Sequence, residues 1–137
     1  MIHNSDFEGQ REALAIFANT FLQQNFSLFP KSIKVFLGSD FVVIKVDKFS
    51  WQADVEIKGG KIDKKLSHEM YSRLFDSVKA IFVARIEQIT HKKVLSCRFN
   101  IDLEIELCVV DFILESKTNM VRTKLALLFR HHGNRNN

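Results

Sequence analysis

The sequence has few of the residues on which common binding and catalytic motifs depend. Its 137 residues include five glycines, one proline and two cysteines. It contains no G-x-x-x-x-G-K, G-x-G-x-x-G or G-x-S-x-G motif. These motifs build phosphate-binding loops and the nucleophile elbow of hydrolases. Neither class of site is therefore predicted.

The cysteines and histidines are too scattered to predict a metal centre. Cys97 and Cys108 form no C-x-x-C pair, which argues against a zinc ribbon, and two cysteines make no disulfide framework. The five histidines form neither an H-E-x-x-H motif nor a Cys/His ligand set: His3, His68, His91, His131 and His132. We therefore expect two free thiols, no metal, no cofactor, no catalytic residue and no enzyme activity.

Long apolar runs are also missing. No stretch reaches the roughly 18 consecutive apolar residues that span a bilayer. Residues Met1 to Glu8 are polar and acidic, so no signal peptide is expected. The chain is 46% hydrophobic with a net charge of +4, which is ordinary for a folded domain. These features predict one cytoplasmic domain.

The positive charge lies at one end of the chain. Residues 1–115 hold 15 basic and 16 acidic side chains, a net −1, whereas residues 116–137 hold five basic side chains and no acid, a net +5. We expect residues 1–115 to form one α+β domain and residues 116–137 a basic C-terminal helix and tail. The candidate contacts with an anion or a partner are Lys117, Arg122, Lys124 and Arg130.

Hydrophobic periodicity predicts helices over residues 6–24 and 63–90 and hairpins over 32–46 and 94–114. In the first hairpin, a turn centred between Ser39 and Asp40 pairs Leu37 with Val42 and makes one face wholly aliphatic. In the long helix, the expected core stripe is Leu66, Met70, Leu74, Val78, Ile81, Phe82, Ile86 and Ile89. Tyr71 and Phe75 widen that surface, either for a dimer partner or within the monomer.

The second hairpin has no Gly or Pro at its tip, so the sequence does not specify the position of its turn. A turn centred at Asp102-Leu103 would place Cys97 opposite Cys108. The acidic run Asp102, Glu104 and Glu106 has period two, which predicts one exposed strand face. The alternation of apolar and polar residues shifts by one position near Leu107-Cys108, which predicts a β-bulge or a strand covered on both faces.

Two further segments are ambiguous. Residues 47–63 are compatible with a short strand at 53–57 or with a flap in which Trp51 is the candidate binding aromatic, although core packing is the commoner place for a tryptophan. Residues 118–132 predict a short basic amphipathic helix that docks on its own domain, swaps to a partner or lies on an anionic membrane.

The predicted fold is therefore a two-layer α-β-β-α-β-β sandwich with an antiparallel sheet, helices on one face and a short C-terminal helix. The other face of the sheet needs a cover, which a homodimer could supply.

Two segments resemble a known family. They are Pro30-Lys31-Ser32-Ile33-Lys34-Val35, continuing through Asp40 to Val46, and Arg85 to Ser96 with its Ile89-Thr90-His91-Lys92-Lys93-Val94 core. Together they resemble the MpsC-like family of small bacterial proteins, named for component C of a sodium-translocating, membrane-potential-generating system. The resemblance covers roughly residues 10–115. It implies a cytoplasmic accessory protein linked to ion or bicarbonate transport, with a place at the inner face of the membrane and a membrane-transport partner.

The chain departs from the family pattern at several positions. A Gly commonly follows the Thr, but here the residue is His91. The strand usually shows a His and an Asp where this chain has Arg98 and Asn100, and the tip of the second hairpin usually contains Gly. Two alternatives to the accessory role are a nucleic-acid-associated protein that uses the basic tail and a small-ligand-binding domain that uses Trp51.

Overall fold

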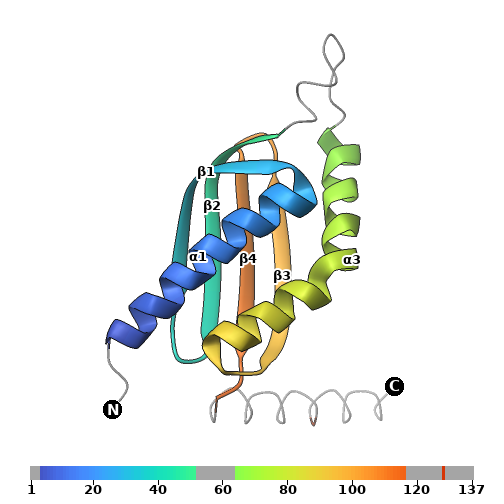
Figure 1. The fold of residues 1–137 in the computed structure, drawn as a ribbon. Helices are drawn as coiled ribbons and strands as arrows, with labels where there is room; N and C mark the ends of the chain where they lie inside the picture. The colour runs from blue at the N-terminus through green and yellow to red at the C-terminus, as the bar shows by residue number, and fades with distance from the viewer. Residues whose placement is uncertain (1–3, 52–63, 117–127, 129–137) are drawn as a thin grey trace.

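The computed structural model describes residues 4–51, 64–116 and 128. The element order is α1 (Asn4–Phe26), β1 (Leu28–Leu37), β2 (Phe41–Trp51), α3 (Lys64–Thr90), β3 (Val94–Asp102) and β4 (Leu107–Leu114). The strands form one four-stranded sheet in the order β1-β2-β4-β3, and every neighbouring pair is antiparallel. Figure 1 shows both helices on the same face of this sheet. The predicted two-layer α+β fold is confirmed, while its C-terminal helix lies outside the described residues.

Helix α1 is two residues longer at each end than the sequence pattern predicted. Its buried stripe is Leu14, Ala18, Phe21, Leu22 and Phe26, at the three- and four-residue spacing of one helix face. Ser27 follows the helix with a φ of 52°, the left-handed conformation that often ends helices. The chain then enters β1, where Pro30 is tolerated because β1 is an edge strand.

The first hairpin has the predicted register. Leu37 pairs with Val42, Val35 with Ile44 and Ile33 with Val46. The turn is closed by a hydrogen bond from the Gly38 amide to the Phe41 carbonyl, 3.0 Å long, so its centre lies between Ser39 and Asp40.

Strand β2 continues past the predicted end at Val46. Lys48 has a φ of 56°, and its amide donates to the carbonyl of Glu106 over 2.8 Å. The side-chain alternation shifts there, because Val46 and Phe49 are both buried although they are three residues apart. Trp51 ends the strand and its backbone pairs with Leu28. Residues 47–51 are thus strand and not the start of a flap, while the predicted strand at 53–57 and the rest of the predicted flap, residues 52–63, lie outside the described residues.

Helix α3 buries part of the predicted stripe: Phe82 and Ile86 are fully buried, and Leu74, Val78 and Ile89 pack partly buried against the core. Tyr71, Phe75, Phe82 and Ile86 are buried, so the aromatic surface packs within the monomer and not against a partner. Met70 and Ile81 are exposed, which makes their assignment to the core wrong. Figure 1 shows that α3 bends along its length. In its middle the Ser77 hydroxyl donates to the Leu74 carbonyl over 2.7 Å, a back-bond that favours bending.

The second hairpin differs most from its prediction. Asp102 pairs with Leu107, so residues 103–106 form the turn. Cys97 pairs with Phe112 and Cys108 with Ile101, so the two thiols are not opposite one another. The acidic run does not share a strand face, because Glu104 and Glu106 lie in the turn.

The one-residue shift in the apolar–polar alternation near Leu107-Cys108 comes from this turn and not from a bulge in β4. Strand β4 alternates regularly and buries Cys108, Val110, Phe112 and Leu114. The Asp102 carboxylate accepts the amides of Glu104 and Ile105, and Glu106 takes a φ of 51°. The ladder irregularity lies instead between Val94 and Ser96. A polar side chain and one left-handed residue thus make the turn without glycine.

Aromatic side chains join the two layers. Phe82 of α3 lies 4.6 Å from Phe21 of α1 and 5.3 Å from Phe112 of β4, measured between ring centroids. Phe75 stacks on Phe99 of β3 at 4.6 Å. Such ring pairs add to the free energy gained from burial. The core is therefore fixed between the helices and one face of the sheet, which leaves the opposite face outside it.

Candidate docking face

The uncovered face of the sheet has an apolar corner at the end near the β1–β2 turn. Phe36 pairs with Val43, and Phe41 pairs with Ile113. Phe36 is 50% exposed, Phe41 41% and Ile113 40%. Their neighbours Val35, Val42 and Phe112 are buried on the opposite face, as strand alternation requires. We call Phe36, Phe41, Val43 and Ile113 the apolar corner.

Charged side chains cross the middle of the same face. Lys34 stands directly opposite Lys45, and Lys45 forms an ion pair with Asp47 at 3.7 Å. Further across the sheet, the Arg98 guanidinium bonds the Asp111 carboxylate at 3.1 Å. The face is therefore amphipathic, with an apolar end and a mostly paired charged middle. Contiguous exposed apolar residues with a polar surround are typical of protein contact sites.

Gly38 holds the ring of Phe41 in place. A β-carbon added at Gly38 would lie 2.2 Å from the Phe41 ring, far inside van der Waals contact. The glycine is needed here for this close approach, because the ring packs against its bare backbone. The turn and the exposed aromatic ring are therefore one structural unit.

Two neighbouring segments hold the turn beside the corner. The Lys92 ammonium donates to the Ser39 carbonyl, and the Leu114 amide donates to the Asp40 carbonyl over 2.8 Å. The Glu115 amide donates to the Lys93 carbonyl over 2.8 Å. The α3–β3 loop and the end of β4 thus meet the β1–β2 turn and are bonded to each other. The chain leaves the described domain at Ser116, beside the apolar corner.

The loop between α3 and β3 depends on His91 in a left-handed conformation. His91 has a φ of 60°, and its amide bonds the Glu87 carbonyl over 2.8 Å, which closes the end of α3. The buried hydroxyl of Thr90 donates to the Ile86 carbonyl over 2.8 Å. The Gly that commonly follows this Thr in the family pattern suits the same backbone, because glycine adopts positive φ without strain.

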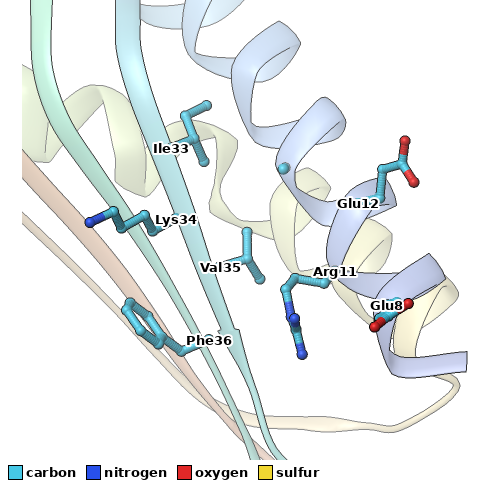
Figure 2. A pocket seen from close by; sticks show the side chains of 8 residues that line it. Glu8, Arg11, Glu12, Ile33, Lys34, Val35 and Phe36 are labelled. Atoms are coloured by element: carbon cyan, nitrogen blue, oxygen red, sulfur yellow. The ribbon is translucent and has the colours of Figure 1, made fainter. Parts of the chain in front are cut away.

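An open groove of about 540 Å³ lies between α1 and the edge strand β1. Glu8, Arg11 and Glu12 line it from α1, and Ile33 and Val35 line it from β1. Figure 2 shows Val35 on the groove side of β1, while Lys34 and Phe36 point to the other side of the strand. Phe36 also borders the groove, so the groove and the apolar corner lie on opposite sides of β1 and share this residue.

The described residues offer little reactive chemistry. No group of three or more His, Cys, Asp or Glu side chains in ranges 4–51 and 64–116 is arranged to hold a metal ion. Burial raises the pKa of Cys108 to about 12, and burial is also the main reason that the pKa of Cys97 rises to about 11. Both thiols are protonated at neutral pH and are weak nucleophiles. The arrangement is suited to binding through a surface.

The structure does not test the site residues that the sequence predicts. Lys117, Arg122, Lys124 and Arg130 lie outside the described residues, as does the side chain of Trp51. The apolar corner was missed, although a signal was present. In the first hairpin, apolar and polar residues alternate regularly, but Phe36 and Val43 stand at positions where polar residues are expected. An apolar side chain at such a solvent-facing position indicates a contact surface.

Within the part of the chain that the structure describes, no helix has both the length and the apolar character to cross a bilayer. No curated protein and no solved structure gives a match to this sequence. A family model described as "Na+-translocating membrane potential-generating system (MpsC)" matches residues 11–116, from the second turn of α1 to the end of the described domain. Because this match covers most of the chain and all four strands, the protein belongs to the MpsC family.

Proposed function

We propose that this protein is a non-enzymatic accessory or regulatory component of a membrane system that transports ions or bicarbonate. It acts from the cytoplasm, at the inner face of the membrane, and docks on a membrane-transport protein through the apolar corner. The description of its family supports the link to a sodium-translocating, potential-generating system. The observation that carries the docking role is the exposure of two phenylalanines and an isoleucine on the face of the sheet that the helices leave bare.

The charges around the corner support a protein partner. Lys45 is paired with Asp47 and Arg98 with Asp111. A surface whose apolar part is bordered by charges that already have partners resembles the core and rim of a transient protein interface. No described residue favours the nucleic-acid or small-ligand alternatives, because their candidate residues lie outside the described part of the chain.

The test replaces the chromosomal copy in the native host with the double variant Phe41→Asp and Ile113→Asp. Both side chains are exposed, so the variant is expected to fold, which circular dichroism of the purified protein checks. Burying two carboxylates in a contact should abolish docking, because unpaired charges are costly to desolvate. We expect deletion of the gene to lower the membrane potential and sodium- or bicarbonate-dependent growth, and we expect the double variant to reproduce that loss.

The matched control is Ile81→Asp, which places the same charge on an exposed isoleucine of α3 in the other layer. It should support wild-type membrane potential. A folded double variant that restores the deletion strain as well as wild type would refute docking through the corner. A deletion strain with normal potential and growth would refute the transport role itself.

A further inference from the structure

The groove beside β1 is longer than its first hollow. A second hollow of about 290 Å³ is lined by Ile16, Asn19 and Lys31, and it shares Ala15 and Ile33 with the first. The two hollows therefore form one continuous groove along α1 and β1. Its floor and walls are partly apolar, and Ile16 on its rim is exposed. We call this continuous feature the α1–β1 groove.

The edge of β1 disfavours an added strand as the occupant of this groove. Pro30 removes one backbone donor, and Lys31 and Lys34 are exposed along the strand. Proline and lysine on an edge strand are the usual obstacles to strand pairing. An occupant should therefore bind through side chains, as an amphipathic helix does when it lies in a groove.

The C-terminal segment of this chain has a matching length and pattern. From Pro30 to Phe36 the groove follows β1 for about 20 Å, at roughly 3.3 Å per residue. A helix over residues 118–132 would be about 22 Å long, at 1.5 Å per residue. Val121, Leu125 and Leu128 have the i, i+4, i+7 spacing of one helix face.

Position also favours this occupant. The charged side chains that line the groove are of both signs, Glu8, Arg11 and Glu12 on α1 and Lys31 and Lys34 on β1, so the fit rests on length and position and not on charge. The chain leaves β4 at the sheet end that holds the β1–β2 turn, because the Leu114 amide bonds Asp40. Phe36 and Glu8 line the groove at that same end. The segment therefore begins at the same end of the sheet as a mouth of the groove, two strands away from β1.

We infer that residues 118–132 of a second copy of this chain occupy the α1–β1 groove, so that two copies exchange their C-terminal segments reciprocally. Only residue 117 lies between Ser116 and a helix that begins at residue 118, and one residue spans at most about 4 Å. Within the sheet, β4 lies two strands, about 10 Å, from β1. The groove also lies above the sheet, toward the helices, so the distance to it is longer still. The link is thus short for a chain to fill its own groove. Leu128, which is described and helical, is 57% exposed in the single chain.

Cysteine cross-linking of the full-length protein tests this directly. One preparation carries Ala15→Cys and another carries Leu128→Cys, and the two are mixed and mildly oxidised. We expect a disulfide-linked dimer of the two variants on a non-reducing gel. The native thiols interfere little, because burial raises the pKa of Cys97 to about 11 and of Cys108 to about 12. The matched control replaces Ala15→Cys with Glu104→Cys at the exposed far turn, which should give no link.

Light scattering gives an independent measurement. The wild-type protein should have twice the 15.9 kDa mass of the chain at micromolar concentration. Deletion of residues 117–137 should give a monomer, and so should Ala15→Arg, which fills the groove. Circular dichroism checks that both variants fold. The Phe41→Asp, Ile113→Asp variant should remain dimeric, which separates this inference from the proposed docking role.

Three results would overturn the inference. A chain with both Ala15→Cys and Leu128→Cys that closes a disulfide within one monomer would show that the segment fills its own groove. A dimer that survives both the deletion and Ala15→Arg would place the interface elsewhere. A wild-type protein that scatters as a monomer, with no cross-link to position 15, would show that the groove does not take this segment.

Discussion

The two faces of the sheet differ although they are made by the same strands. In β4, Cys108, Val110, Phe112 and Leu114 point to the helices and are almost completely buried, while Asp111 and Ile113 between them lie on the bare face. The helix-covered face has all the contacts that hold the layers together. The bare face has apolar side chains that none of the described helices and strands covers. Stability should therefore depend on one face, and recognition on the other.

The largest expected effect is the difference in stability loss between substitutions of two adjacent residues of β4. Phe112→Ala should lower the free energy of unfolding by about 3–5 kcal/mol, because it leaves a cavity beneath Phe82. Ile113→Ala, one position along and on the bare face, should lower it by about 1 kcal/mol or less. Urea titration of both variants measures the difference. Equal losses would show that the bare face also stabilises the fold.

A second prediction concerns the thiol on the covered face. Burial raises the pKa of Cys108 from 9.0 to about 12, so the unfolded chain loses this proton at lower pH than the folded protein. The contribution of this protonated thiol to the free energy of unfolding is complete below pH 9. It falls as pH rises toward 12, by about 1.4 kcal/mol per pH unit. Unfolding measured from pH 8 to pH 10.5 should show this loss. In Cys108→Ala the decline should be shallower, and an unchanged slope would contradict the assignment.

The smallest effect is expected from the ion pair on the bare face. Arg98 and Asp111 are bonded at 3.1 Å, but the arginine is largely exposed. A double-mutant cycle with Arg98→Ala and Asp111→Ala should give a coupling of about 0.2–1 kcal/mol. The coupling should shrink further in 1 M salt because mobile ions screen exposed charges. A coupling above 2 kcal/mol would mean that the bare face is more shielded from water than its exposure indicates.

The two hairpins show how far the sequence predicts this fold. In the first, alternating side chains and the Gly38-Ser39-Asp40 turn specify both the strands and their register, because only one pairing puts all aliphatic residues on one face. In the second, the turn has neither Gly nor Pro. Its geometry depends on the Asp102 carboxylate and on Glu106 at positive φ, and neither feature has a distinct sequence pattern.

Helix α3 and the candidate site were less predictable for another reason. Ile81 and Phe82 are adjacent and both apolar, so periodicity alone could not tell which one faces the sheet. The bend in α3 further changes which side chains reach the core. For the site, the sequence directed attention to the basic tail and Trp51, whereas the described contact surface consists of apolar side chains at positions expected to be polar.

The close approach of Phe41 to Gly38 has a consequence for the kinetics of recognition. The ring lies directly against the glycine, and this contact restricts the positions that the ring can take before a partner arrives. A side chain that is already ordered loses little conformational entropy when it is covered. Gly38→Ala would push the ring away without removing any atom of the contact surface. Binding would then slow, since a partner would more often meet the ring in an unproductive orientation.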